Sequence, residues 1–393
     1  MPHTTPIQAP AFPSRLPGVG TTIFTVMSAL AAETGAVNLG QGFPDFGCDP
    51  KLTSLVNDAM REGLNQYPPM SGVAPLRAAI SGKIERLYGH RYDAEREITV
   101  TAGGTQAIFT AVLCCAGPGD EVIVLDPCYD CYVPAIKMAG ARAVRVPLTP
   151  GTFRPDFGRI AAALTPRTRL LISNTPHNPG GAVWSSADMR ALQDMLASTA
   201  VLLLSDEVYE HMVYDGARHE SVARYPGLAA RAFIISSFGK TYHVTGWKIG
   251  YVAAPAALTD ELRKVHQFNV FTVNTPMQHG IARYLQDPAP YLNLSAFYTE
   301  RRERLRAALA RTRLRLLPCQ GTYFQCAAYD GLSIAERDLN EADFCLWLTR
   351  EIGVAAVPLS AFYGNAFDQK IIRFCFAKRN ETLDEAARRL ARL

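Results

Sequence analysis

The chain has 393 residues, more than one ordinary hydrophobic core accommodates, and its length predicts two domains. Hydrophobic residues make up 48% and charged residues 19%, which is the range of globular proteins and excludes a disordered chain. The formal net charge is only +4, with neither a basic tail nor a block of like charge. The sequence therefore indicates no binding of nucleic acid or of a membrane surface.

The N-terminal 20 residues are rich in proline and lack the apolar stretch of a signal peptide, and no later stretch is long enough to span a bilayer. Nine cysteines, an odd number, indicate free thiols and predict a cytoplasmic protein. Cys128 and Cys131 form a C-x-x-C pair, but zinc would need a second pair, which the sequence lacks. No metal site is predicted, and a redox role of this pair is a minor alternative.

Helical spacing and a possible threonine N-cap predict a helix over residues 21–30, followed by a short strand near residue 37. From residue 49 onward, helices alternate with short apolar runs. These runs cover residues 98–100, 122–125, 170–173, 201–204 and 232–235. Continuous apolar strands separated by helices predict an α/β fold, with a mostly parallel sheet covered on both faces.

The pattern changes near residue 291, where a long charged helix around 300–312 precedes strand-like pieces at 321–324 and 371–376. We interpret this part as a smaller α+β domain that the N-terminal segment joins in space. The predicted division is a segment of residues 1–46, a large domain of residues 47–290 and a small domain of residues 291–393.

Several chemically useful residues follow the predicted strands, and ligands of parallel sheets bind beyond the carboxyl ends of the strands. Gly103, Gly104 and Thr105 stand between a strand and a helix, where backbone N–H groups can bind a phosphate, although a plain tight turn has the same pattern. Asp206 follows four apolar residues, so its carboxylate needs a cationic partner unless it is only a helix N-cap. Lys240 follows Gly239 beyond another strand, where burial would lower its pKa, although a surface lysine is the plainer reading.

Three further side chains near these ends could contact a flat ligand. Tyr209 is expected one helical turn beyond Asp206, and Asn178 lies in a proline-rich turn. Tyr129 offers an aromatic face for stacking, although a core aromatic is commoner.

One ligand matches all of these groups: a pyridine ring with a phosphate, a phenolic oxygen and an aldehyde. The sequence therefore predicts a site for pyridoxal 5′-phosphate, in which Lys240 binds the aldehyde, Asp206 the ring nitrogen and the glycine loop the phosphate. Ser237-x-x-Lys240 also fits the acylating serine of penicillin-binding proteins, but the Ser-Asp-Asn partner of that motif is missing.

Four motifs make the chain resemble a known family over nearly its whole length: Asn38-Leu39-Gly40-Gln41-Gly42-Phe43-Pro44-Asp45-Phe46, residues 174–179, Ser205-Asp206-Glu207-Val208-Tyr209-Glu210 and residues 237–250. The resemblance is to the class I aminotransferases of the aspartate aminotransferase fold (fold type I). Within them it is greatest to the methionine and the kynurenine–glutamine aminotransferases.

The resemblance implies a role for each of these residues. Lys240 is expected to move the proton between the substrate α-carbon and the cofactor, with Asn178 and Tyr209 on the cofactor's phenolic oxygen. The residues expected around the phosphate are Gly104, Thr105, Ser237 and Lys248. Tyr67 is expected to reach the phosphate of a neighbouring subunit, which implies a homodimer with shared active sites.

Arg373 matches the arginine that binds the substrate α-carboxylate, for which its planar fork is suited. The other residues expected on the substrate side are Asn178, Gly42, Ile23 and Phe24, with Phe271 and Tyr363 as further members of an apolar wall. Phenylalanine at position 24, where kynurenine enzymes usually have tryptophan, follows the methionine type.

The predicted reaction is a two-stage (ping-pong) transfer of the amino group of a neutral L-amino acid to a 2-oxo acid. Methionine is the first candidate donor, followed by phenylalanine, tyrosine, glutamine and kynurenine. The alternatives are a cysteine-S-conjugate β-lyase on the same fold and a non-catalytic cofactor-binding regulatory domain.

Overall fold

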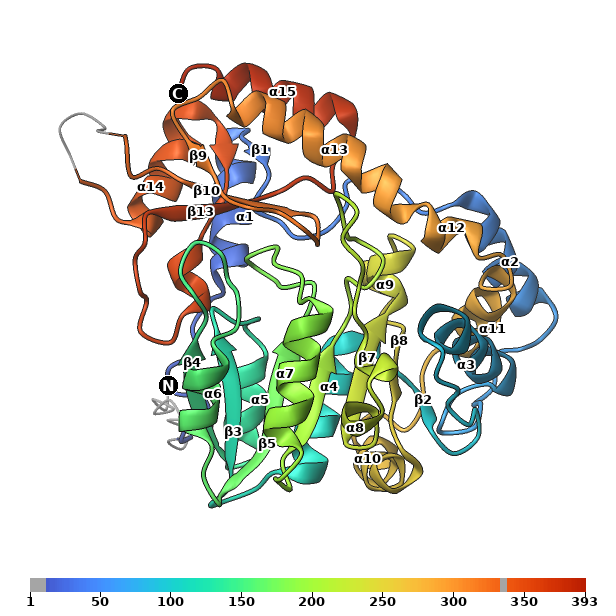
Figure 1. Cartoon of the computed structure of the whole chain (residues 1–393). Helices are drawn as coiled ribbons and strands as arrows, with labels where there is room; N and C mark the ends of the chain where they lie inside the picture. Colours follow the sequence, from blue (N-terminus) through green and yellow to red (C-terminus); the bar gives the residue numbers. More distant parts are fainter. Residues whose placement is uncertain (1–11, 333–337) are drawn as a thin grey trace, which may run out of the picture.

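A seven-stranded sheet forms the centre of the larger part of the molecule (Figure 1). The computed structural model describes residues 12–332 and 338–393. In spatial order the strands are β2 (Ile98–Thr101), β8 (Gly250–Ala253), β7 (Ala232–Ser237), β6 (Leu202–Asp206), β5 (Thr168–Asn174), β3 (Glu121–Asp126) and β4 (Arg142–Pro147). Strand β8 runs antiparallel to both of its neighbours, and the other neighbouring strands pair in parallel. The carboxyl ends of the remaining six strands therefore lie along one edge.

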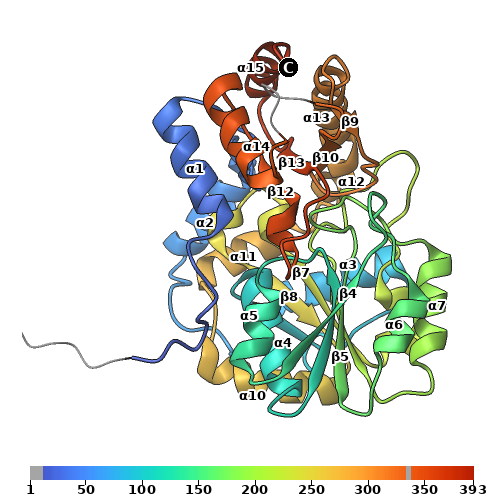
Figure 2. The same ribbon diagram turned by 90° about the vertical axis from the view of Figure 1, so that its left-hand side faces the viewer.

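Helices cover both faces of this sheet, as Figure 2 shows. On one face lie α4 (Gly103–Cys115), α5 (Tyr132–Met138) and α10 (Ala256–Asn269), and on the other α6 (Phe157–Ala163), α7 (Ser186–Leu196) and α8 (Pro226–Ala229). Alternate side chains of β3 enter different hydrophobic clusters: Val122 and Val124 one, Ile123 and Leu125 the other. Because both faces are buried, the strands read as continuous apolar runs, and the predicted mostly parallel sheet is confirmed.

The five predicted strands of this sheet are present, but β4 and β8 were not predicted. Strand β4 alternates arginine with apolar residues and is largely exposed, and β8 begins directly after the lysine loop as a four-residue piece. Strand β4 thus lacks the continuous apolar run of the predicted strands, whereas β8 is as apolar and as long as β2 but follows the loop motif without a helix of more than one turn between them.

A second sheet lies in the C-terminal part, with the order β12 (Val357–Pro358), β13 (Ile371–Cys375), β10 (Phe324–Ala328) and β9 (Arg315–Leu316). It is accompanied by α13 (Leu294–Leu309), α14 (Glu341–Trp347) and α15 (Asn380–Leu390). The predicted strand at 321–324 is mostly wrong, because Thr322 has a φ of 67° and β10 starts only at Phe324.

The N-terminal segment lies against this C-terminal part (Figure 1). Helix α1 (Ile23–Thr34) begins after Thr22, whose hydroxyl accepts a hydrogen bond from Thr25 N, so the predicted N-cap is confirmed. Strand β1 (Val37–Asn38) then pairs in parallel with β11 (Val354–Ala355). The domain boundaries at residues 46 and 290 stay predictions.

The remaining elements flank the large sheet or connect its strands. Helices α2 (Pro50–Arg61), α3 (Ala74–Tyr88) and α11 (Thr275–Tyr284) pack together. Two further helices are short: α9 (Phe238–Thr241) and α12 (Ala289–Leu292). The structure also contains 3₁₀ turns at Val222–Arg224, Thr245–Trp247 and Leu359–Phe362 and a π turn at Leu348–Ile352.

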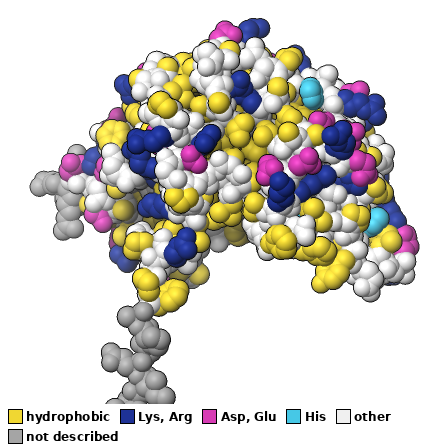
Figure 3. All heavy atoms as spheres, turned by 90° about the horizontal axis from the view of Figure 1, so that it is seen from below, with side chains coloured by type: hydrophobic (Ala, Val, Ile, Leu, Met, Phe, Trp, Pro, Cys, Tyr) yellow, Lys and Arg dark blue, Asp and Glu magenta, His cyan; other side chains and the backbone are white. Residues whose placement is uncertain are grey.

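The surface agrees with the small net charge. On the face seen in Figure 3, basic and acidic side chains are interspersed with hydrophobic ones rather than separated. In the described part of the chain, every helix is too short or too polar to cross a lipid bilayer.

Candidate active site

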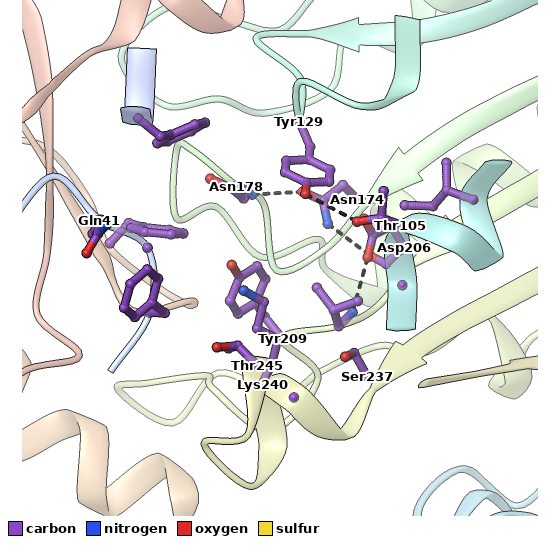
Figure 4. Close-up of a pocket in the computed structure, with 18 of the residues that line it drawn as sticks. Gln41, Thr105, Tyr129, Asn174, Asn178, Asp206, Tyr209, Ser237, Lys240 and Thr245 are labelled. Atoms are coloured by element: carbon purple, nitrogen blue, oxygen red, sulfur yellow. Dashed lines mark hydrogen bonds between the residues drawn. The ribbon is translucent and has the colours of Figure 1, made fainter. Parts of the chain in front are cut away.

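A cavity of about 660 Å³ lies at the carboxyl edge of the large sheet. The side chains of Lys240, Asp206 and Tyr129 converge on it from separate elements (Figure 4). Its wall combines strand ends of the large sheet with pieces of the N-terminal segment and of the second sheet. The lining residues are Phe24, Thr25, Ser28, Ala29, Gln41, Gly42, Phe43, Gly104, Thr105, Ile108, Tyr129, Asn174, Asn178, Asp206, Val208, Tyr209, Ser237, Gly239, Lys240, Thr245, Lys248, Phe324 and Arg373.

Lys240 lies in the single-turn helix α9, which directly follows β7. Its Nζ donates a hydrogen bond to Tyr323 Oη at 2.9 Å. Burial lowers the pKa of Lys240 from 10.5 to about 8. A sizeable fraction of this amine is therefore neutral near physiological pH, as a nucleophilic lysine requires.

Asp206 ends β6, and its carboxylate is 3% exposed. Its Oδ2 accepts a hydrogen bond from Tyr132 Oη at 2.6 Å, and its Oδ1 accepts one from Val208 N at 3.3 Å. Burial raises the pKa of Asp206 to about 6, although the bond from Tyr132 acts in the opposite direction. No lysine, arginine or histidine of the described residues forms an ion pair with it. A cation in the cavity would therefore stabilise the ionised carboxylate.

The segment after Asp206 is a turn, so the expected helix is wrong. Glu210 N donates to Glu207 O and Met212 N to Tyr209 O, and no helix follows. Asp206, a possible helix N-cap from the sequence, therefore caps no helix, and the two glutamates that follow it fix the turn.

Buried polar bonds hold both glutamates of this turn. Glu207 accepts hydrogen bonds from Ser205 Oγ at 2.9 Å and from Val222 N at 3.0 Å. Glu210 pairs with Lys83 of α3 at 2.6 Å, both side chains being 2% exposed. Burial alone would raise the pKa of Glu210, but Lys83 holds it below its usual value. This anchoring orients Asp206 and Tyr209 toward the cavity.

The predicted phosphate loop lies at the start of α4. Gly104, Thr105, Ser237 and Lys248 line the cavity. Gly103 does not, but its φ is +77° and a Cβ built on it would stand 3.2 Å from Lys248 Nζ. Its missing side chain thus lets Lys248 approach the helix start, where unpaired N–H groups and a basic side chain favour an anion.

Arg373 comes from β13 and is 1% exposed. Its Nη1 donates to Asn178 Oδ1 at 2.8 Å and its Nη2 to Gly40 O at 3.3 Å, while its Nε has no partner in the described structure. Among residues 12–332 and 338–393, no carboxylate forms an ion pair with this guanidinium. A buried, unneutralised arginine on a cavity wall is suited to an anionic ligand.

Aromatic rings surround the guanidinium of Arg373. Its Cζ lies 3.8 Å from the ring centre of Phe324, 4.9 Å from that of Phe362 and 5.4 Å from that of Phe24. The rings make this end of the cavity apolar apart from the arginine itself.

Besides Gly103, four predicted residues are not among those that line the cavity. Tyr67 is 83% exposed and packs edge-on against Phe271. Ile23 packs between two hydrophobic clusters, and Tyr363 accepts a hydrogen bond from Gln369 at 2.7 Å. The apolar wall predicted from Ile23, Phe24, Phe271 and Tyr363 therefore keeps only Phe24 within this chain.

The sequence reasoning missed several residues at the site: Tyr132, Asn174, Thr245, Tyr323 and Phe324. Asn174 Nδ2 donates to Asp206 O at 2.9 Å and its Oδ1 accepts from Asn178 N at 2.8 Å, so it joins two predicted positions. It stands in the recognised 174–179 motif, which could have revealed it. Tyr132 and Tyr323 carry no comparable signal.

The C-x-x-C pair does not contribute to the cavity wall. Cys128 and Cys131 are buried free thiols, and burial raises the pKa of both. Within the described ranges, no group of three or more His, Cys, Asp or Glu residues is placed to hold a metal ion.

Comparisons with known proteins agree with this geometry. A family model described as aminotransferase class I and II matches residues 34–390. A methionine aminotransferase of Escherichia coli K12 is 50% identical over 381 residues, which are 97% of this chain and 98% of that protein. A probable N-succinyldiaminopimelate aminotransferase of Mycobacterium tuberculosis is 43% identical over 96% of this chain and 97% of its own length. Kynurenine–oxoglutarate transaminase 3 of the rat is 35% identical over 95% of this chain and 88% of its own.

Solved structures give the same result. An E. coli protein whose structure and reactivity identify a methionine aminotransferase function superposes with a TM-score of 0.95 at 49% identity, covering 98% of this chain and 100% of that chain. The M. tuberculosis N-succinyldiaminopimelate aminotransferase superposes with a TM-score of 0.92 at 43% identity, covering 97% and 99%. The fold is that of the fold type I aminotransferases, and the chain belongs to the class I and II aminotransferase family.

Proposed function

We propose that this aminotransferase uses pyridoxal 5′-phosphate to transfer the amino group of a neutral apolar or aromatic L-amino acid to a 2-oxo acid. The observation that carries the proposal is that Lys240, whose pKa burial lowers to about 8, and the buried carboxylate of Asp206 face one cavity. The proposed donors are methionine first, then phenylalanine, tyrosine, glutamine and kynurenine. The relatives named above are all aminotransferases, which favours transfer over elimination.

The donor groups around the cavity fit this cofactor. Asp206 is a buried carboxylate without a cationic partner in the described chain, and a protonated ring nitrogen would provide one. The proposed phosphate ligands are the start of α4 with Gly104 and Thr105, together with Ser237 and Lys248. Asn178 and Tyr209 are the proposed partners of the phenolic oxygen, and Tyr129 of the ring face.

Pyridoxal phosphate, when bound, supplies a ring that withdraws electrons from the α-carbon of the amino acid. The chain's own residues would do the rest. Arg373 would bind the substrate α-carboxylate as a fork, which fixes the α-carbon near Lys240. The neutral Lys240 amine would take the proton from that α-carbon in the first half of the reaction. In the second half it would return a proton to the α-carbon of the product amino acid.

Substrate preference would come from the apolar end of the cavity. Phe24, Phe43, Phe324 and Ile108 line the cavity together with Arg373, and Lys378 lies beside the Phe43 ring with its Nζ 5.6 Å from the ring centre. An apolar pocket distinguishes one methylene by only ~1–3 kcal/mol, so a range of neutral donors is expected.

The proposed assembly is a homodimer with shared active sites, in the cytoplasm. Tyr67 and Phe271 form an exposed aromatic pair, with exposures of 83% and 43%, and Phe268 nearby in the chain is 86% exposed. Such exposed rings favour contact with a second copy of the chain. All nine cysteines are free, as expected for a reducing compartment.

Lys240→Ala tests the function. The variant should retain some cofactor binding and lose transamination with every donor of a panel that shares one 2-oxo acid, because the residual site has no nucleophilic amine. Turnover at the wild-type rate would overturn the assignment. Release of pyruvate and ammonia from a cystathionine-like substrate without an oxo acid would favour the β-lyase alternative instead.

A further inference from the structure

A tyrosine that the sequence did not single out lies against the proposed catalytic lysine. The Oη of Tyr323 accepts a hydrogen bond from Lys240 Nζ at 2.9 Å and donates one to the carbonyl of Gly42 at 2.6 Å. Tyr323 is fully buried in the short loop that precedes β10. Two successive hydrogen bonds thus connect Lys240, through Tyr323, to Gly42 in the N-terminal segment.

The direction of these bonds is fixed by chemistry. A carbonyl oxygen only accepts, so the single hydroxyl proton of Tyr323 must go to Gly42. Toward Lys240 the same hydroxyl can then only accept, and the amine must donate. A neutral amine has two hydrogens and one lone pair, and the bond to Tyr323 takes up one hydrogen while it leaves the lone pair free.

The surroundings keep the hydroxyl in this role. The Tyr323 ring lies edge-on to Tyr209, with ring centres 5.2 Å apart, and it also packs against Phe324 at 4.8 Å. Burial raises the pKa of Tyr323 well above its usual value, so the phenol stays protonated at working pH. The Lys240 ammonium nitrogen lies 5.6 Å from the ring centres of both Tyr209 and Tyr323.

We propose that Tyr323 is a positioning residue for Lys240: its hydroxyl, fixed by the Gly42 carbonyl, holds the amine whenever that amine is not bound to the cofactor, with the lone pair of the amine open to the cavity. The inference rests on the proposed function of Lys240. A lysine side chain has many rotamers, and an amine that must collect a proton from one atom and deliver it to another gains from a fixed resting place.

Tyr323→Phe tests the proposal, because it removes the hydroxyl and keeps the ring packing on which folding depends. Tyr298→Phe is the matched control: Tyr298 is fully buried, its ring centre is 5.7 Å from that of Tyr323, and its hydroxyl has no partner in the described structure. Both variants should unfold at temperatures close to the wild type.

The first readout does not depend on turnover. In the full chain freed of cofactor, competitive acetylation with acetic anhydride and peptide mass spectrometry gives the pKa of Lys240. Loss of an acceptor that favours the charged amine should lower that pKa by about one unit in Tyr323→Phe and leave it unchanged in Tyr298→Phe. Cys375, Lys248, Asp206 and Arg373 also act on this amine, and all four are the same in both variants.

The second readout is the kinetic isotope effect with an α-deuterated donor. In Tyr323→Phe, kcat should fall roughly 10- to 100-fold, less than the roughly 10²- to 10⁴-fold contribution of a proton-transfer group itself, because Lys240 is still present. KM should be nearly unchanged, and the isotope effect should rise. If Tyr323→Phe matches Tyr298→Phe in pKa and isotope effect, the positioning role is wrong while the proposed function stands. If the wild-type chain does not attach pyridoxal 5′-phosphate at Lys240, the proposed function itself fails.

Discussion

Replacement of Arg373 by leucine separates binding of the substrate carboxylate from stability of the fold. In the structure this guanidinium is 1% exposed, has one side-chain acceptor at 2.8 Å and one carbonyl at 3.3 Å, and has no carboxylate partner among the described residues. Burial lowers its pKa from the ordinary 12.5. The described chain thus keeps a buried charge without an ion-pair partner, with Asp130 as a more distant acidic neighbour, and the substrate carboxylate would pair with it.

Loss of one partner of a buried, hydrogen-bonded charge pair costs about 2–5 kcal/mol, or roughly 30- to 5000-fold in kcat/KM. The loss should be similar for every amino donor, since all present the same α-carboxylate. Arg373→Lys keeps the charge without the fork and should still lose at least about tenfold. Arg304→Leu, an exposed control on α13, should have no effect.

The stability of Arg373→Leu should change little. The loss of the hydrogen-bond donors to Asn178 Oδ1 and Gly40 O should lower the free energy of unfolding by about 1 kcal/mol each. Removal of a buried charge without an ion-pair partner should raise it. The entropy of unfolding is about 2.1 cal/mol/K per residue, summed here over 393 residues. A change of about 2 kcal/mol in the free energy of unfolding would therefore move the unfolding temperature by only ~2–3 °C.

A donor panel at one oxo acid concentration, together with thermal unfolding of the same preparations, measures both effects. A loss confined to one donor would mean that Arg373 contacts side chains. A large drop in the unfolding temperature would mean that the arginine is structural, and would refute the argument from its missing counter-ion.

Three further predictions concern buried charges. Burial raises the pKa of Asp206 from 3.8 to about 6, so between these pH values the folded chain binds more protons than the unfolded chain. The contribution of Asp206 to the free energy of unfolding therefore falls as the pH rises from about 4 to 6, and above pH 6 the loss amounts to about 3 kcal/mol. Asp206→Asn should therefore raise the urea midpoint of the cofactor-free protein at pH 7.5 while it weakens cofactor binding, and a lower midpoint contradicts this. Lys83→Met leaves Glu210 buried without its cation and should lower the free energy of unfolding by about 3–5 kcal/mol. Most of this loss should be recovered when Glu210→Gln is added. Equal unfolding temperatures of Lys83→Met and wild type would exclude the pair as an anchor. Attachment of pyridoxal 5′-phosphate to Lys240, followed by absorbance, should accelerate with pH and level off above about 8, and a flat profile from pH 6 to 10 would oppose a neutral-amine requirement.

The cofactor end of the cavity was predictable from the sequence because of a general property of parallel sheets. Residues that directly follow buried strands meet at one edge, so Lys240, Asp206 and Thr105 could be grouped without knowledge of strand order. The same reasoning gave Tyr209 at the site but wrongly put it on a helix. Glu210 of this turn is held by Lys83, 127 residues away, and local propensity contains no information on such contacts.

The substrate end was less predictable for the same physical reason. Tyr323 is 83 residues from Lys240, and its hydroxyl reaches the carbonyl of Gly42, 281 residues away. Such contacts depend on how the second sheet and the N-terminal segment settle on the large sheet. Phe24 and Arg373 could be proposed only from resemblance, and Ile23 and Tyr363, proposed in the same way, point elsewhere in this chain.

The parallel pairing of Val37–Asn38 with Val354–Ala355 has a consequence for biosynthesis. Strand β1 is synthesised first but cannot pair until β11, near the C-terminus, has left the ribosome. Residues 24–43 therefore cannot take their final position before that point of translation. The phosphate end and Lys240 can be in place once α10 and α11 have been made, after about residue 284, whereas the wall around Arg373 closes only when translation is almost complete. A ribosome-bound chain arrested before β11 would thus be expected to accept the vitamin while it fails to recognise the amino acid.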